Sequence, residues 1–122
     1  MANTTGRSGG HAFEEYKVTA LAATAATELE TVYKSDSPLI VQQQVTAISG
    51  TGAKITTKLE DSVDGTNWNE VTAFTAAEAT GVAIKKIKAN EYVLGPKVRL
   101  NHVIAGTEPK VTATLVVYGT PA

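Results

Sequence analysis

The chain has 122 residues, of which 43% are hydrophobic and 19% charged, and its formal net charge is -1. This length fits one domain. The balance of 11 basic and 12 acidic residues argues against electrostatic capture of nucleic acid, because phosphate binding needs a clear basic excess. The lack of cysteine excludes disulfides, thiolate metal sites and cysteine catalysis. No run reaches the roughly 18–20 apolar residues of a membrane span, so we expect no membrane contact.

The N-terminal residues 1–12, MANTTGRSGGHA, are polar and show no apolar periodicity. Gly, Ser, Thr and Asn dominate them, which predicts an extended, flexible arm. We place the arm at residues 1–13 and a β-sandwich domain at 14–122. The next stretch is ambiguous, because residues 20–26 are rich in Ala but carry no apolar stripe at helical spacing. We expect short strands at 16–23 and 29–33.

The remainder of the chain is typical of strands, since apolar and polar residues alternate over short segments separated by Gly, Pro and Asn. In the first segment we expect Val41, Val45 and Ala47 to share one face. His102 falls on what should be an inward face, between Leu100 and Ile104. The strands are expected at 39–48, 54–60, 68–74, 82–87, 97–104 and 110–118. This pattern predicts an all-β fold, an antiparallel β-sandwich of jelly-roll or immunoglobulin-like type with an extended N-terminal arm.

One internal repeat stands out. Residues 47–59, AISGTGAKITTKL, and residues 103–115, VIAGTEPKVTATL, are identical at six of thirteen positions. Each copy reads as a strand, a Gly-Thr turn and a strand, so we expect two similar β-hairpins. Gly50 and Gly106 would supply the positive φ of each turn. The repeat concerns the fold and not the chemistry.

The acidic segment 60–70, EDSVDGTNWNE, is the first candidate for a cation site. With Gly65 at the sixth position of a calcium-binding loop, the twelfth position holds Val71, so the bidentate acid is missing. Asp64-Gly65 is instead a strong turn dipeptide, and a hairpin turn is the preferred interpretation. A calcium site in this loop stays open as the alternative.

Other residues that could carry chemistry have simpler structural roles. Trp68 is expected to anchor the core, with exposure as a sugar-stacking platform as the alternative. No Gly-x-Ser-x-Gly elbow is present, and no second histidine can complete a zinc site with His102. The cluster of Lys85, Lys86 and Lys88 is expected to protect a strand edge from pairing with another chain. We therefore expect no enzyme, no metal and no cofactor.

The order of these motifs resembles that of small β-sandwich virion proteins of tailed bacteriophages. The likeness rests on the acidic patch and turn from Asp61 to Trp68, on Val98-Arg99, on Gly106-Thr107 and on the Val-rich final strand. The stretch LAATAAT at 21–27 is also similar to the N-terminal segment of that group. The resemblance covers roughly residues 18–118, and its motifs are those of turns and strands.

The resemblance implies a capsid decoration (cement) protein on the outer surface of a phage head, where it would stabilise the lattice of the major capsid protein. Such a protein is expected to be a homo-oligomer, most simply a trimer at three-fold positions. Because an arm can wrap a large surface as it orders, we expect lattice contacts from residues 1–13 and 14–33. The residues expected to interact are Thr4, Arg7, His11, Phe13 and Tyr16.

Two other classes of protein remain open. The first is a carbohydrate- or receptor-binding module, whose signature would be Trp68 on one exposed face with Tyr33, Tyr92 or Tyr118. The second is a tail or neck structural protein, because virion parts share the sandwich fold and a fold does not fix a function.

Overall fold

The computed structural model describes the backbone of residues 4–8 and 11–122 and the side chains of residues 11–122. This part of the chain forms antiparallel strands, and none of it forms a helix that could cross a membrane. The fold is an all-β antiparallel sandwich, as the alternation predicts. Its strands are β1 (Thr4–Ser8), β2 (His11–Leu21), β3 (Ala25–Glu28), β4 (Leu39–Ser62), β5 (Asn69–Ala73), β6 (Gly81–Ile87) and β7 (Lys97–Gly119).

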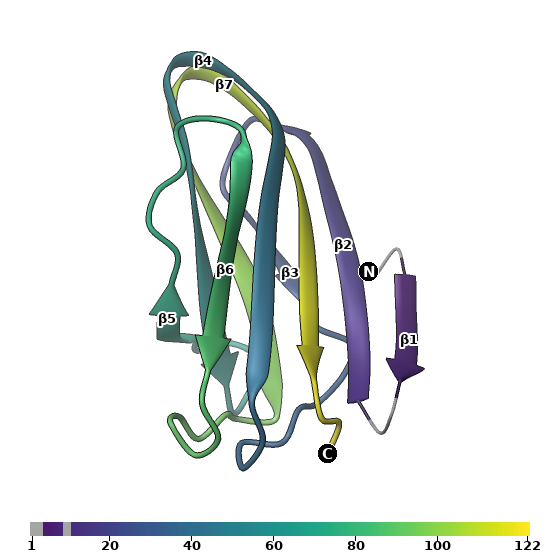
Figure 1. Ribbon diagram of the computed structural model, residues 1–122. Coiled ribbons are helices and arrows are strands. Elements are labelled where there is room, and N and C mark those ends of the chain that lie inside the picture. Colours follow the sequence, from purple (N-terminus) through teal and green to yellow (C-terminus); the bar gives the residue numbers. More distant parts are fainter. Residues whose placement is uncertain (1–3, 9–10) are drawn as a thin grey trace.

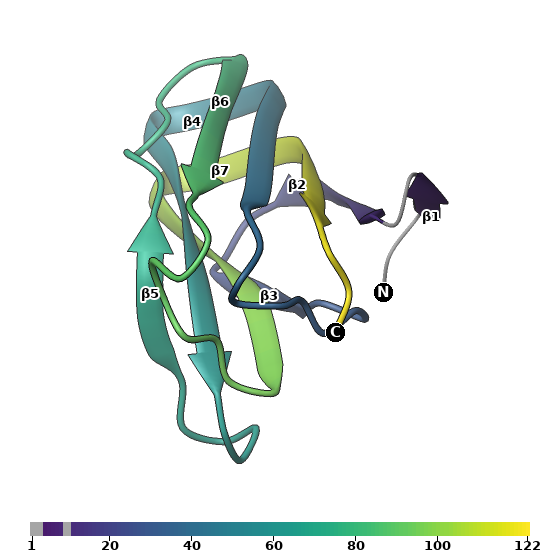
Figure 2. The same cartoon turned by 60° about the horizontal axis from the view of Figure 1, so that its bottom comes forward.

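Two long strands, β4 and β7, pair along their whole length and run through both layers of the sandwich (Figures 1 and 2). Layer one contains β1, β2, the second half of β7, the first half of β4, and β6. Layer two contains β3, the first half of β7, the second half of β4, and β5. The two layers are thus a single sheet folded over on itself at one bend.

The internal repeat forms this bend and does not form two hairpins, so that prediction is wrong. Each copy lies within one continuous strand, and the two copies pair with each other. The equivalent residues Thr51 and Thr107 are direct partners, so a local two-fold axis passes between them. Gly50 has φ 112° and Gly106 has φ 117°, which favours glycine at both corners. The strands expected at 39–48 and 54–60 are therefore one continuous strand, β4, and those expected at 97–104 and 110–118 are one continuous strand, β7.

A methyl group at either glycine would meet the backbone of the opposite copy. A Cβ on Gly50 would lie 2.7 Å from the carbonyl oxygen of Glu108, and one on Gly106 would lie 2.7 Å from the Cα of Ala53. The two strands can cross this closely only because both positions lack a side chain. The sequence identity of the two copies thus reflects one shared backbone constraint.

The core lies between the two layers and follows the expected alternation along β4 and β7. Ile55, Thr57 and Leu59 are buried on one face of β4. A shift in register between Val45 and Ala47 changes the face, so Ala47 is exposed, contrary to the prediction. The largest fully buried apolar side chains are Tyr16, Val41, Ile55, Leu100, Val111, Leu115 and Val117. Each contributes roughly 1.5–3 kcal/mol to folding by its burial.

The N-terminal part of the chain joins layer one earlier than expected. Ala12 is buried and pairs with Gly119 of β7, so the sandwich begins at His11 and the boundary at residue 14 is wrong. Residues 4–8 of the expected arm form β1, which pairs with β2. Residues 1–3 and 9–10 lie outside the described residues. The strand expected at 29–33 is replaced by β3, and Tyr33 forms one bridge to Pro121.

Candidate functional site

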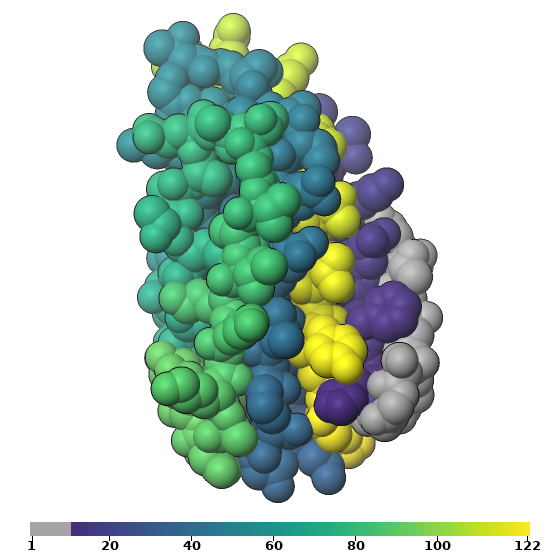
Figure 3. Space-filling view, viewed as in Figure 1, coloured from purple at the N-terminus to yellow at the C-terminus, as the bar shows by residue number. Residues whose placement is uncertain are grey.

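The outer face of layer one is not covered by any other strand of the described chain (Figure 3). Register places its side chains in three rows that cross β2, β7, β4 and β6. The rows are Phe13, Tyr118, Ile40 and Lys86; then Glu15, Val116, Gln42 and Ile84; then Lys17, Thr114, Gln44 and Val82. We call Phe13, Tyr118, Ile40, Val116, Ile84 and Val82 the apolar band. Ile40 lies diagonally next to Ile84, whereas Gln42 and Gln44 separate the β7 residues from Ile84 and Val82 along the rows.

Several side chains of this band are open to solvent. Val82 and Ile84 are 57% and 56% exposed, while Phe13, Ile40, Val116 and Tyr118 are partly buried by their neighbours. The ring of His11 extends the band by stacking on Tyr118, with ring centroids 5.1 Å apart and planes inclined by 17°. The exposed apolar side chains of this face are therefore concentrated on β6, with partly buried ones beside them on β2, β7 and β4.

The residues predicted to interact are only partly brought together. His11 and Phe13 lie on the outer face of layer one, beside Tyr118. For Thr4 and Arg7 only the backbone is described, opposite Glu15 and Ala12 respectively. Tyr16 is 1% exposed and belongs to the core, so its assignment as a contact residue is wrong.

Tyr16 has a structural role in a buried network around Glu14. The Glu14 Oε1 atom accepts hydrogen bonds from the Tyr16 hydroxyl at 2.6 Å and from the backbone N–H groups of Glu30 at 2.7 Å and Thr31 at 3.1 Å. Its Oε2 atom accepts one from the Tyr33 hydroxyl at 2.6 Å. Burial and the nearby carboxylate raise the pKa of both tyrosines well above the usual range. The network fastens the segment after β3 to β2.

The outer face of layer two is polar, and several of its charged side chains form ion pairs with one another. Arg99 Nε lies 2.7 Å from Glu60 Oε1, and the guanidinium stacks 4.3 Å above the Trp68 ring. Lys58 pairs with Glu70 at 3.3 Å. Trp68 is thus half-buried on the outer surface under a guanidinium, and the prediction that it anchors the core is wrong.

The aromatic set expected of a carbohydrate platform is not assembled. Tyr33 is 4% exposed and donates to Glu14. Tyr118 lies on the outer face of layer one, on the side of the sandwich away from Trp68. Tyr92 is exposed in the loop between β6 and β7. Trp68 therefore does not share one exposed face with Tyr33 or Tyr118.

The acidic loop is the tight turn that its sequence favours. Asp64 Oδ1 accepts hydrogen bonds from the backbone N–H groups of Thr66 and Asn67, both at 2.8 Å, and Oδ2 accepts one from the Asn67 amide. These donors hold the pKa of Asp64 below its usual range. Gly65 takes the positive φ of 79° that the turn needs. Among the described residues, no group of three or more His, Asp or Glu side chains is placed to hold a metal ion.

A small polar cluster is buried between the layers. His102 is fully buried on the inward face, as predicted, and its Nδ1 lies 3.2 Å from the hydroxyl oxygen of Thr57, which donates to Gln43 Oε1. Its Nε2 has no hydrogen-bond partner within the described part of the chain. Burial lowers the pKa of His102 to about 4, so the ring is neutral at pH 7.

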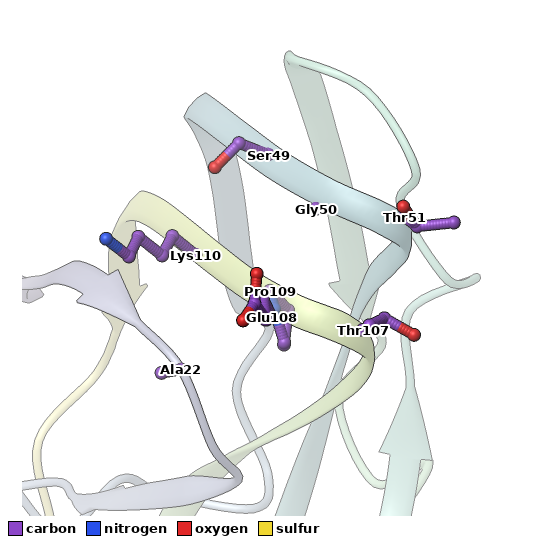
Figure 4. A pocket seen from close by; sticks show the side chains of 8 residues that line it. All are labelled: Ala22, Ser49, Gly50, Thr51, Thr107, Glu108, Pro109 and Lys110. Carbon is purple, nitrogen blue, oxygen red and sulfur yellow. The ribbon is translucent and has the colours of Figure 1, made fainter.

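A hollow at the bend is lined by small and polar residues of both repeat copies (Figure 4). Ser49 and Lys110 point to one side of the crossing strands, whereas Thr51 and Thr107 point to the other.

We compared the chain with protein families, with curated proteins and with solved structures. No family model matches the chain, and no curated protein matches it. A solved structure described as "CBM4 structure and function" is similar at 9% identity and a TM-score of 0.42, over 100% of this chain and 75% of that one.

The sequence contains a signal for the outer face of layer one that simple alternation hides. At Leu39-Ile40-Val41 and again at 115–118, LVVY, apolar residues occupy consecutive positions, so both faces of each strand are apolar. Strands that are apolar on both faces are normally covered on both. In the structure Val41 and Val117 face the core, whereas Ile40, Val116 and Tyr118 lie on the outer face of layer one.

Proposed function

We propose that this chain is a structural virion protein, a capsid decoration protein that binds the outer surface of a tailed-phage head and stabilises the capsid lattice. It acts as a trimer at three-fold positions and works by binding rather than by catalysis. The motifs at 61–68, 98–99, 106–107 and 115–118, which resemble phage β-sandwich virion proteins, support this assignment.

The observation that carries the proposal is the contrast between the two outer faces of the sandwich. Layer two presents charges that are paired within the chain, as in Arg99 with Glu60. Layer one presents Val82 and Ile84 more than half exposed, on the same face as Phe13, Ile40 and Val116. Exposed apolar surface costs solubility unless a partner covers it, so a binding role explains its presence.

A decoration protein stabilises its target by linkage. Its site exists only where capsid subunits are assembled, so binding lowers the free energy of the assembled lattice relative to separated subunits. A stiff body suits this task, because little conformational entropy is then lost on binding. The Glu14 network and the long β4–β7 ladder supply that stiffness in layer one.

A carbohydrate-binding module is the less favoured alternative. Its expected signature is Trp68 on one exposed face with Tyr33, Tyr92 or Tyr118. Arg99 covers the Trp68 ring, and Tyr33 is buried. A tail or neck protein differs from a decoration protein only in its place in the virion, so the same experiment separates the two.

The test is co-sedimentation of the purified protein with undecorated, mature heads of its own phage. We expect saturable binding to heads, no binding to purified tails, and rupture of decorated heads at a higher temperature than undecorated ones. Heads that already carry the native protein are the matched control and should take up none. Binding to tails alone would instead identify a tail or neck protein, and failure to bind any virion part would contradict the proposal.

A further inference from the structure

The outer face of layer one has a charge of its own. Lys17 and Lys86 are its exposed bases, and Glu15 is its one acidic residue in the three rows. The face is therefore net positive, although the whole chain has a net charge of -1. The two lysines sit at opposite edges, one on β2 and one on β6, with the apolar band between them.

This arrangement disfavours a second copy of the chain as the occupant. Two such faces would bring net positive charge against net positive charge, which opposes association. Four strands about 4.8 Å apart and five residues of about 3.3 Å rise give a face of roughly 300 Å². A stable soluble interface buries about 800 Å² on each partner, so this face alone is too small to hold a dimer.

Addition of a strand at the β6 edge is also disfavoured. In the described chain β6 pairs with β4 alone, which leaves its other edge open. Lys85 and Lys86 lie in β6 and Lys88 follows it directly, and charged lysines on an edge strand oppose pairing with another chain. A partner must therefore lie flat on the face and contact side chains, with no shared backbone ladder.

We propose that the outer face of layer one, and not the N-terminal arm, is the main contact with the capsid, and that it recognises an apolar patch bordered by acidic side chains. This inference rests on the proposed function. The apolar band would be buried against the patch, while Lys17 and Lys86 would pair with the acids at its edges. His11 and Phe13 take part because they are continuous with the band.

Because the face is small, a single copy would bind the capsid weakly, and stable binding would need several copies to engage together. One copy would bind weakly, but three faces of a trimer that engage together act at a high effective concentration. The combined area is roughly 900 Å², comparable with one side of a standard interface. Specificity for the assembled head then follows, because only the lattice presents the patches at the required spacing.

The experiment compares four variants of the full chain in the head-binding assay. Ile84→Glu places a charge in the apolar band, and Val93→Glu is its control, since Val93 is 87% exposed in the loop before β7. Lys86→Glu reverses a charge on the face, and Lys110→Glu does so at the bend. All four residues are at the surface, so thermal melts and solution masses should match those of the wild type.

We expect Ile84→Glu and Lys86→Glu to weaken head binding by at least about fivefold, the effect of losing a contributing interface residue, and the two controls to stay within about twofold. Raising the ionic strength should weaken wild-type binding but leave the Lys86→Glu variant less sensitive. If the wild type binds heads and both face variants bind equally well, the inference is wrong and the proposed function stands. If the wild type does not bind heads, the proposed function fails and this inference fails with it.

Discussion

The two outer faces of the sandwich are built on the same two strands but have opposite character. On the layer-two half of β4 and β7, Glu60, Lys58 and Arg99 find partners within the chain. On the layer-one half, Ile40, Val116 and Tyr118 face outward, and Ile40 and Tyr118 are direct cross-strand partners. The difference shows that the exposed apolar side chains are not a property of the strands themselves. Under the proposed function, the apolar face of layer one is the side that meets the capsid.

Substitutions at the bend should have the largest effect on the free energy of unfolding, because β4 and β7 cross there with no room for a side chain. Gly50→Ala and Gly106→Ala each force a Cβ against the opposite backbone and a strained φ, so we expect a loss of about 3 kcal/mol or more in the free energy of unfolding. Gly52→Ala is the matched control: φ is 63°, and nothing lies within 4 Å of its Cβ. It should cost only about 1 kcal/mol. Urea denaturation measures all three, and equal losses would contradict the role given to the crossing.

The inner side of layer two predicts a loss of stability in acid. The pKa of His102 is lowered to about 4 in the fold from 6.5. The unfolded chain therefore binds more protons between these values, and stability falls as the pH drops through this window. The full effect is about 3 kcal/mol, since one pKa unit corresponds to about 1.4 kcal/mol. The His102→Leu variant should lose this part of the slope in urea melts from pH 7 to 4, and an unchanged slope would contradict the neutral buried ring.

The outer face of layer two should depend on one of its ion pairs more than on the other. Glu60 is 9% exposed, so Arg99→Ala leaves a nearly buried carboxylate without its main partner, and we expect a loss of about 2 kcal/mol. Lys58→Ala removes a pair whose side chains are 35% and 50% exposed, and should cost about 0.5 kcal/mol or less. Head binding should not change in either variant. Weakened binding in both would place layer two at the lattice.

The outer face of layer one should contribute least to folding. Ile84 is 56% exposed, so Ile84→Ala is expected to change the free energy of unfolding by no more than about 0.5 kcal/mol. The same substitution at the fully buried Ile55 should cost about 3 kcal/mol. A large loss at Ile84 would mean that this side chain serves the fold, and the contrast between the faces would weaken.

Most strands could be predicted because period-two alternation reports directly which side of a strand is buried. Ile55, Leu100 and His102 lie inward for this reason. The bend could not be predicted as such, because a glycine with positive φ suits a tight turn and a crossing strand equally well. Only the pairing of Thr51 with Thr107 distinguishes the two cases.

The candidate site was harder to predict than the fold, for a physical reason. Tyr16 alternates correctly but carries a polar tip, and only the Glu14 carboxylate beneath it explains how that tip is buried. Trp68 was expected inside because of its size, yet Arg99 covers its ring from the outer surface. The apolar band joins residues from four strands that are up to about a hundred positions apart. Register across a sheet, which single-strand patterns do not contain, brings them together.

The most direct test of the central claim is a cryo-electron microscopy map of decorated heads at a resolution that allows this chain to be placed. We predict that Phe13, Tyr118 and Ile84 face the density of the capsid protein, with Arg99 and Trp68 directed away from it. A map in which layer two or the bend lies against the capsid, with the outer face of layer one open to solvent, would contradict the account.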